Sequence, residues 1–281
     1  MDPWTQPIAH WRIPVDSAAR HRELIDTGRL LSRWAPAPHE PAPTDCFQVG
    51  PAFWIWQPGV GGIQFFSDQP EFFAFPEARG DQAWFEYVVT RSWLPAVYQV
   101  WGRQVIHASA VARRETGEVL VFVGPSHAGK STLAYGLSRR PGWCHVGDDT
   151  LAFSSEKSGL MLHALPNDAR LRPQTATHYG RPGTPEPIGW PEAPLHLGRV
   201  YFLSGDPDLP VPVSIDPLGG ADSYRCLLEQ AHAFALTIPE YNQRLMRDYL
   251  DLATRVPGFR LAYRKSFDAL DAVFDAIERQ D

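Results

Sequence analysis

Residues 124–132 have the types and spacing that phosphate chemistry requires. Their sequence, GPSHAGKST, matches the pattern G-x-x-x-x-G-K-[ST]. Glycines in this pattern let backbone N–H groups turn towards phosphate oxygens, the lysine reaches the β- and γ-phosphates, and the serine hydroxyl ligates Mg²⁺. We therefore predict a nucleotide site with Mg²⁺ on Ser131. The residues expected to contact the nucleotide are Gly124, Ser126, His127, Ala128, Gly129, Lys130, Ser131 and Thr132.

A pair of carboxylates, Asp148 and Asp149, follows about fifteen residues after this segment. Phosphoryl transfer needs an acidic partner for Mg²⁺ and, in a kinase, a base near the acceptor hydroxyl. Neighbouring residues of an extended chain point to opposite sides, so one carboxylate can face the metal while the other faces the acceptor. The alternative is an acidic turn that only faces solvent.

Two histidines and two arginines are weaker candidates. His107 lies in an apolar segment, where a structural histidine bonded to Ser109 or to backbone is the competing interpretation. His127 is equally compatible with a solvent-facing position. Arg170 and Arg172 would share one face of an extended segment and could hold an acidic acceptor or the transferring phosphoryl group, although surface arginines are the commoner case.

The elements around residues 124–132 are those that such a loop needs. An apolar strand is predicted over 119–123, and Leu133, Ala134 and Leu137 recur at helical spacing until Pro141. The preceding strand, 105–111, turns back through residues 115–118, so the strand that feeds the loop runs antiparallel to its predecessor. This hairpin predicts an α/β fold with a mixed sheet rather than a parallel, doubly wound one.

The rest of the chain divides into two predicted parts. Short aromatic-rich pieces at 46–49 and 53–56 alternate with Gly and Pro, which is typical of small antiparallel strands. The spacing over 81–101 predicts a helix broken near Pro95. We predict a β-rich accessory domain with a linking helix over 1–92 and a catalytic domain over 93–281. Listed from the amino end, the remaining predicted elements are an interrupted strand at 144–153 and helices at 222–235 and 266–278.

Composition excludes some classes of function. The chain has 281 residues, 44% of them hydrophobic, which is enough for a full core. A net charge of −6 without a Lys/Arg run argues against nucleic acid as a partner. Three widely spaced cysteines suggest thiols in a reducing compartment, and no stretch reaches the roughly 18 apolar residues of a membrane span. We expect a cytoplasmic protein with no membrane partner.

The segment from His107-Ala108-Ser109 through the hairpin and the 124–132 loop to Gly147-Asp148-Asp149 resembles the catalytic domain of the HPr serine kinase/phosphorylase family. Residues 101–110 resemble more closely the HPr-kinase-related proteins found beside peptide-modification genes, lasso-peptide kinases among them. The resemblance covers residues 93–155 well and the remainder of the C-terminal part more loosely.

This resemblance implies a fold related to phosphoenolpyruvate carboxykinase, the use of ATP with Mg²⁺, and phosphorylation of a serine hydroxyl in a peptide or protein, with a lasso-peptide precursor as one candidate. It implies nucleotide binding by residues 124–132, a general-base role for Asp148, metal or hydrogen-bond support from Asp149 and an active-site role for His107. We also predict a catalytic role for Lys130, which reaches the phosphates.

Two other functions remain open. A kinase of a small metabolite such as serine, with the same fold, would be favoured by a pocket closed by residues 165–220. A nucleotide-dependent regulatory binding module would be favoured if Asp148 and Asp149 did not face the phosphates. The sequence is compatible with a homo-oligomer as well as with a monomer.

Overall fold

The computed structural model describes residues 8–12, 15–35, 42–163, 165, 169, 171–181, 193–234 and 238–280. By its contacts the chain divides into a first unit, Met1–Arg103 with Ala233–Leu245, and a second unit, Gln104–His232 with Met246–Asp281. Both units combine helices with a sheet, so the predicted α/β class with mixed sheets is confirmed.

The first unit contains a sheet whose described strands follow the order β1-β6-β5-β4-β3-β2. Strand β1 runs parallel to β6, and the other neighbours are antiparallel. The short antiparallel strands predicted at 46–49 and 53–56 are confirmed as parts of β3 and β4. The bounds are β1 Ile8–Trp11, β2 Arg29–Trp34, β3 Thr44–Val49, β4 Ala52–Gln57, β5 Gly61–Phe66 and β6 Glu71–Pro76.

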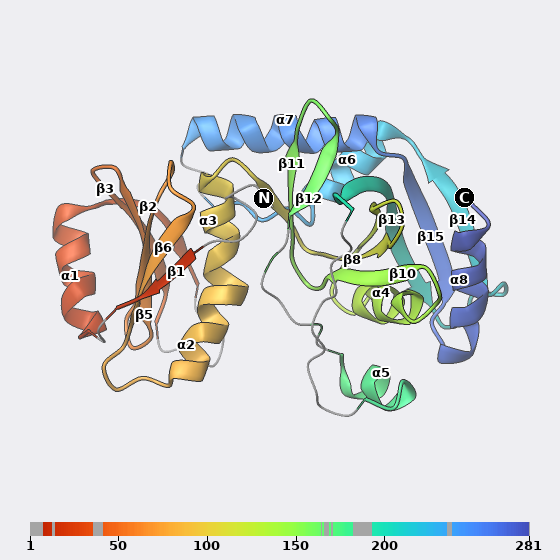
Figure 1. Cartoon of the computed structure of the whole chain (residues 1–281), viewed down its shortest axis with the longest axis horizontal. Coiled ribbons are helices and arrows are strands. Elements are labelled where there is room, and N and C mark those ends of the chain that lie inside the picture. Colours follow the sequence, from red (N-terminus) through yellow and green to blue (C-terminus); the bar gives the residue numbers. More distant parts are fainter. Residues whose placement is uncertain are drawn as a thin grey trace. The chain divides into compact units, whose positions relative to one another are not determined.

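Helix α1, Ser17–Thr27, packs on one face of this sheet (Figure 1). Its start is capped by Asp16, whose carboxylate accepts from the backbone N–H of Ala19 at 2.9 Å. Leu24 is its buried apolar anchor and packs with Phe47, Ala52, Trp54 and Trp56 of the sheet. From the aromatic-rich pieces, Phe47, Trp54 and Trp56 thus lie on the side of the sheet that α1 covers.

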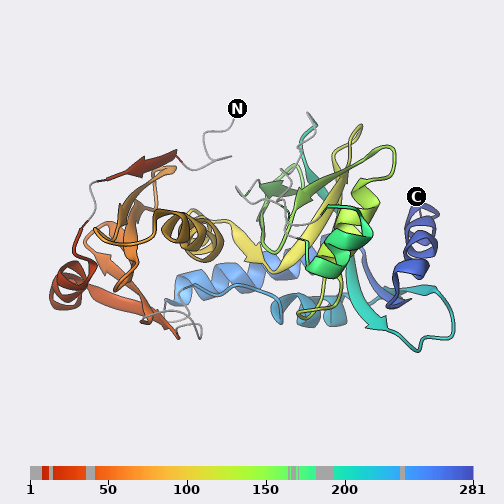
Figure 2. The same cartoon turned by 90° about the horizontal axis from the view of Figure 1, so that it is seen from below.

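The opposite face carries a helical run that begins with α2, Gln82–Val88, and ends with α3, Leu94–Val100 (Figures 1 and 2). The prediction of a helix over 81–101 with an irregularity is confirmed. The irregularity is a π-helical turn at Val89–Trp93, and Pro95 lies in the first turn of α3, where a missing N–H costs no helical hydrogen bond.

Residues 93–103 belong with the first unit, whereas the sequence prediction assigned them to the second part. The side chains of α3 are buried along its whole length. The Trp101 indole N–H donates to the Phe66 carbonyl at 2.7 Å, and the Gln99 side-chain oxygen accepts from the Phe234 N–H at 2.8 Å. The bond to Phe234 also links α3 to Ala233–Leu245, which belong to the first unit.

The second unit holds a sheet with the described order β10-β8-β9-β13-β12-β11-β7, extended by β15 beside β13 and β14 beside β15. Strands β9, β13 and β15 are parallel, whereas β8 runs antiparallel to β9, so the predicted hairpin is confirmed. The bounds are β7 Gln104–Ile106, β8 Ala108–Arg113, β9 Glu118–Val123, β10 Trp143–Gly147, β11 Leu151–Ser155, β12 Leu160–His163, β13 His196–Asp206, β14 Val213–Leu218 and β15 Gly258–Arg264.

The helices of the C-terminal half include one that the sequence prediction missed. The predicted helix at 266–278 corresponds to η2 with α8, and the 17-residue α7 precedes it. The predicted helix at 222–235 is confirmed only as far as α6, which ends at Leu228, because Ala231 pairs with Ile106 instead of continuing the helix. No helix of the described residues has both the length and the apolar character needed to cross a membrane. The bounds are α4 Lys130–Ser138, α5 Pro173–His178, α6 Gly220–Leu228, α7 Pro239–Arg255, η2 Phe267–Ala269 and α8 Leu270–Glu278.

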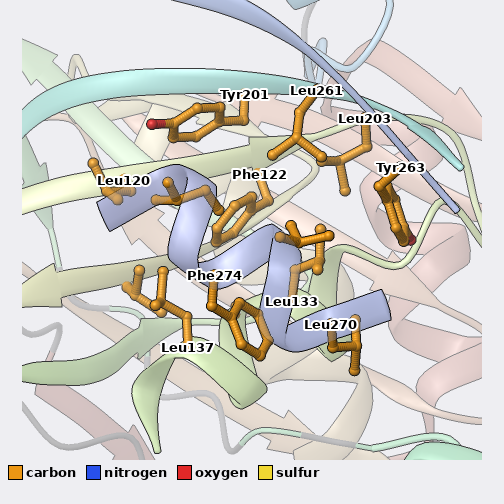
Figure 3. Close-up of a cluster of buried hydrophobic side chains, with 14 of the residues drawn as sticks. Leu120, Phe122, Leu133, Leu137, Tyr201, Leu203, Leu261, Tyr263, Leu270 and Phe274 are labelled. Carbon is orange, nitrogen blue, oxygen red and sulfur yellow. The ribbon is translucent and has the colours of Figure 1, made fainter. Parts of the chain in front are cut away.

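The main core of the second unit lies between helices α4 and α8 and the parallel strands (Figure 3). Each large side chain buried here contributes roughly 1.5–3 kcal/mol relative to exposure. This packing fixes α4 against the strands, so the loop that joins β9 to α4 starts and ends on rigid elements. The residues that Figure 3 labels are Leu120, Phe122, Leu133, Leu137, Tyr201, Leu203, Leu261, Tyr263, Leu270 and Phe274.

Candidate active site

The loop between β9 and α4 adopts a conformation that depends on its glycines. Gly124 has a φ of 157° and Gly129 a φ of 94°. A Cβ on Gly129 would lie 2.1 Å from the Tyr263 hydroxyl oxygen, and this hydroxyl donates to the Ala128 carbonyl at 2.8 Å. The Tyr263 hydroxyl of strand β15 therefore occupies the space that a side chain at residue 129 would need.

Lys130, the first residue of α4, is buried, and its ammonium group points back into the loop. The ammonium donates to the carbonyls of Gly124 at 2.8 Å and Pro125 at 3.2 Å. Burial lowers the pKa of Lys130, the charges of Asp149 and Asp148 oppose that shift, and the charge of Arg172 adds to it. A cation is thus held inside the loop beside two carboxylates.

The start of α4 is open to an anion. Its N-cap residue is Gly129, and within the described chain no side chain caps these backbone N–H groups. The partial positive charge of the helix start and the Lys130 ammonium therefore lie at the same place. Ser131 and Thr132 follow in the first helical turn, and Ser126 lies on the exposed part of the loop. These residues fit the phosphates of a nucleotide.

Asp148 and Asp149 occupy the turn between β10 and β11 but have different surroundings. Asp148 is only 2% exposed, and its Oδ1 accepts from the Ser109 hydroxyl at 2.8 Å. The Asp149 side chain is 58% exposed, and its backbone has a φ of 68°. The charges of both aspartates raise the pKa of Lys130, so both carboxylates lie within electrostatic range of its ammonium.

His107 lies at the break between β7 and β8 and is directed to Asp149. Its Nδ1 is 3.4 Å from Oδ1 of Asp149. Burial lowers the pKa of His107, the positive charge of Lys130 lowers it further, and Asp149 opposes both. Of the two partners suggested for a structural His107, Ser109 directs its hydroxyl to Asp148 instead, whereas the suggested backbone hydrogen bond is present, to Asp149, and opposes the lowering of the His107 pKa.

The structure adds a second histidine that sequence reasoning missed. His232 follows α6. Its backbone N–H donates to the Val105 carbonyl at 2.9 Å, and the backbone N–H of His107 donates to the Gln230 carbonyl at 2.9 Å. Burial lowers the pKa of His232, the His107 ring adds to this, and Asp149 opposes it. No local motif surrounds His232, so only the pairing of its segment with β7 reveals it.

Helix α7 supports the same region from its second half. The Tyr249 hydroxyl donates to the Val105 carbonyl at 2.7 Å, and the Gln104 side-chain amide donates to Asp248 at 2.9 Å. Strand β7, which leads into His107, is therefore held at both Gln104 and Val105 by one helix.

Arg172 and His127 lie together at the exposed side of the loop. The Arg172 guanidinium contacts the His127 ring, with Nη1 3.0 Å from Nε2. The Thr175 hydroxyl is 2.9 Å from the Thr132 hydroxyl, so the start of α5 is tied to α4 as well. Arg172 precedes α5 in an extended conformation. Arg170, the other predicted arginine, lies outside the described residues.

A divalent ion at this site would need ligands beyond the side chains. Among the described residues, no group of three or more His, Cys, Asp or Glu could hold a metal ion alone. Mg²⁺ commonly binds through one or two carboxylates together with substrate phosphates and water. The oxygen donors of Ser131 and Asp149 fit that mode of binding.

No protein-family model matches the chain. No curated protein matches it at a significant level either. Among solved structures, the chain is similar to the HPr(Ser) kinase/phosphatase from Coxiella burnetii, with 12% identity, coverage of 63% of this chain and 90% of that chain, and a TM-score of 0.35. A likeness this distant assigns neither family nor activity, so the chemistry of the site itself has to carry the assignment.

Proposed function

We propose that this chain is an ATP-dependent kinase of HPr-kinase-like fold that phosphorylates a serine-type hydroxyl of a peptide or protein. The observation that carries the proposal is the convergence of Lys130, Asp148, Asp149 and His107 beside the 124–129 loop. A buried cation, an uncapped helix start and two carboxylates of unequal exposure are the parts that phosphoryl transfer requires. The sequence resemblance to HPr serine kinases and lasso-peptide kinases supports the choice of serine as the acceptor.

In this proposal the loop and Lys130 bind the phosphates of ATP, and Lys130 neutralises charge on the transferring group. Lys130 would exchange its bonds to the Gly124 and Pro125 carbonyls for phosphate oxygens. Ser131 and Asp149 would hold Mg²⁺, which would offset the negative charge of the phosphates. His107, next to Asp149, would keep that carboxylate oriented.

Asp148 is proposed as the general base. The acceptor oxygen forms a bond to the γ-phosphorus, the bond from the γ-phosphorus to the bridging oxygen breaks, ADP leaves, and the hydroxyl proton passes to Asp148. The Ser109 hydroxyl donates to Oδ1 of Asp148 at 2.8 Å and holds the carboxylate in place for this role.

Arg172 is proposed to bind the acceptor. It reaches the exposed side of the loop from a different segment, and it contacts only the outer residue His127 of that loop among the partners described. A guanidinium there can hold a carboxylate of a peptide acceptor or the phosphoryl group. Arg170 would share this role by its position in the sequence.

The proposal is tested by incubating the protein with Mg-ATP and a synthetic peptide that carries a serine near a flexible end. We expect mass spectrometry to find one added phosphoryl group on the serine. Lys130→Ala should reduce the rate on the order of 10³-fold or more, because it removes the charge that stabilises the transferring group. Lys157→Ala is the matched control, since Lys157 is exposed on the turn between β11 and β12.

Unchanged transfer by Lys130→Ala would refute the site. Phosphorylation of free serine with no reaction of any peptide would replace the peptide acceptor by a small metabolite. ATP binding without transfer to either acceptor would instead favour a regulatory module.

A further inference from the structure

Ser109 is a buried hydroxyl in an otherwise apolar strand. It lies in β8 between Ala108 and Ala110, and its exposed fraction is 0%. Burying a hydroxyl costs free energy unless the group is hydrogen-bonded. The Ser109 hydroxyl meets this condition by donating to Oδ1 of Asp148 at 2.8 Å. The buried hydroxyl of this strand is therefore bonded to the carboxylate.

The two partners differ in how firmly the backbone holds them. Ser109 lies opposite Phe122 of β9, and from the next residue, Ala110, strand β8 is also paired with β10, so the backbone fixes the position of Ser109. Asp148 lies beyond the end of β10, after an irregularity in the pairing between His145 and Gly147. The backbone of a turn leaves an aspartate side chain several rotamers, and a bond to a fixed donor selects one of them.

In the bond between Ser109 and Asp148 the hydroxyl is the donor and the carboxylate is the acceptor. A hydroxyl that donates to a carboxylate forms a charge-assisted hydrogen bond, which is stronger than a bond between neutral groups. Asp148 is 2% exposed, so water supplies little of the hydration that an ionised carboxylate needs. A protein donor has to replace that hydration, and Ser109 is such a donor.

We propose that Ser109 is a positioning residue for phosphoryl transfer, which holds Asp148 in the orientation needed to accept the proton of the acceptor hydroxyl. This inference rests on the proposed function. Ser109 itself touches neither nucleotide nor acceptor in this role, so its removal should affect the rate of transfer and leave nucleotide binding unchanged.

The test measures kcat, the KM for ATP and the thermal unfolding of the full chain, with Mg-ATP and the serine peptide as substrates. Ser109→Ala should lower kcat roughly 10- to 100-fold, which corresponds to the loss of one hydrogen bond to a charged group. The KM for ATP should stay within about 2-fold. Ser109→Thr keeps the hydroxyl and should recover most of kcat. Ser109→Cys keeps the size but offers only a weak donor, and should resemble Ser109→Ala.

Ser223→Ala is the matched control. Ser223 is also buried in the second unit, and among the described residues its hydroxyl has no hydrogen-bond partner. Its removal should change neither kcat nor the KM for ATP. If Ser109→Ala does not fold, the comparison of Ser109→Cys with Ser109→Thr carries the test.

A double-mutant cycle with Asp148→Asn completes the experiment. If Ser109 acts through Asp148, Ser109→Ala should change kcat less than about 2-fold in the Asp148→Asn background. Full kcat in Ser109→Ala or Ser109→Cys, or an unreduced effect of Ser109→Ala in the Asp148→Asn background, would overturn the positioning role while the kinase activity of the wild type stands. An Asp148→Asn variant as active as the wild type would overturn the base role of Asp148 and this inference with it, while the kinase activity stands. A wild type that transfers no phosphoryl group would overturn the proposed function as well.

Discussion

Asp148 and Asp149 are neighbours in the chain, yet one is buried beside Ser109 and the other is exposed beside His107. Asp148→Asn should slow transfer far more than it weakens binding of Mg-nucleotide, because a base acts on the acceptor proton only in the transition state. Asp149→Asn should weaken both, because a metal ligand already acts in the bound ground state. Nucleotide affinity and single-turnover rate measured for both variants check this division.

The control for these variants is Asp26→Asn on α1, where an exposed aspartate of the first unit is changed in the same way. Equal losses of nucleotide affinity in Asp148→Asn and Asp149→Asn would contradict the assigned roles.

Arg172 gives a second prediction at this scale. Arg172→Ala should raise the KM for the peptide several-fold, because a charged hydrogen bond to the acceptor is lost, with ATP affinity unchanged. Steady-state kinetics with each substrate varied in turn measure both values. Arg139→Ala, an exposed arginine just after α4, should have no effect. A loss of ATP affinity in Arg172→Ala would indicate that this arginine binds the nucleotide rather than the acceptor.

Most candidate residues could be found from sequence because short motifs carry them. The pattern over 124–132 predicts the roles of Lys130 and Ser131 directly, and the spacing of the aspartate pair from that pattern indicates that the pair belongs to the same site. His232 and the bond from Ser109 to Asp148 could not be found in this way. Both depend on segments that are distant in the chain and meet only through strand pairing.

At the scale of elements, the loop depends on the contact between Gly129 and strand β15. Gly129→Ala combines a φ of 94° with a Cβ 2.1 Å from the Tyr263 hydroxyl oxygen. We expect it to destabilise the protein by about 3 kcal/mol or more and to abolish binding of Mg-ATP, because the loop must move. Denaturant unfolding and nucleotide titration measure the two effects.

Gly142 provides the matched comparison for this substitution. Its φ is 83°, but a Cβ there would meet nothing within 4 Å. Gly142→Ala should therefore cost only the backbone strain of about 1–2 kcal/mol and retain nucleotide binding. If both alanine variants behaved alike, backbone strain alone would explain the need for glycine.

The elements that sequence predicted best are those with a clear apolar pattern. Strand β9 is continuously apolar, and α8 buries Leu270, Val273, Phe274 and Ile277 on one face. Helix α1 was missed because its buried side chains are only Ser17 and Leu24. Helix α7 was missed for a similar reason, since most of its side chains are polar and its buried face is short. The boundary at 92/93 remains a prediction that differs from the division after Arg103.

At the scale of the whole molecule, the depressed pKa values of His107 and His232 predict sensitivity to acid. Burial is the main cause in both cases, so the folded chain keeps these rings neutral at a pH where the unfolded chain protonates them. The unfolded chain therefore binds more protons below the ordinary histidine pKa of about 6.5. Stability should be full above that pH and should fall as the pH drops towards the lower pKa values of the folded state.

Urea unfolding between about pH 7.5 and pH 5 measures this dependence, with the ordinary histidine pKa of about 6.5 inside the range. His232→Gln should flatten it, because glutamine does not titrate. His178→Gln changes a histidine of α5 that lies against Phe267 and serves as the comparison. An equally steep dependence in His232→Gln would contradict the assignment to this ring.

The irregular pairing at the end of β10 changes which of the following residues lies opposite each residue of β8. Side chains alternate between the two faces of a strand, so one extra residue exchanges the faces of every residue that follows. Val146, between His145 and Gly147, is such an extra residue, and the aspartate pair follows soon after it. With even pairing there, Gly147 would lie opposite Ser109, at the level that Asp148 reaches in the structure. A single inserted residue thus brings a carboxylate rather than a glycine to the Ser109 hydroxyl.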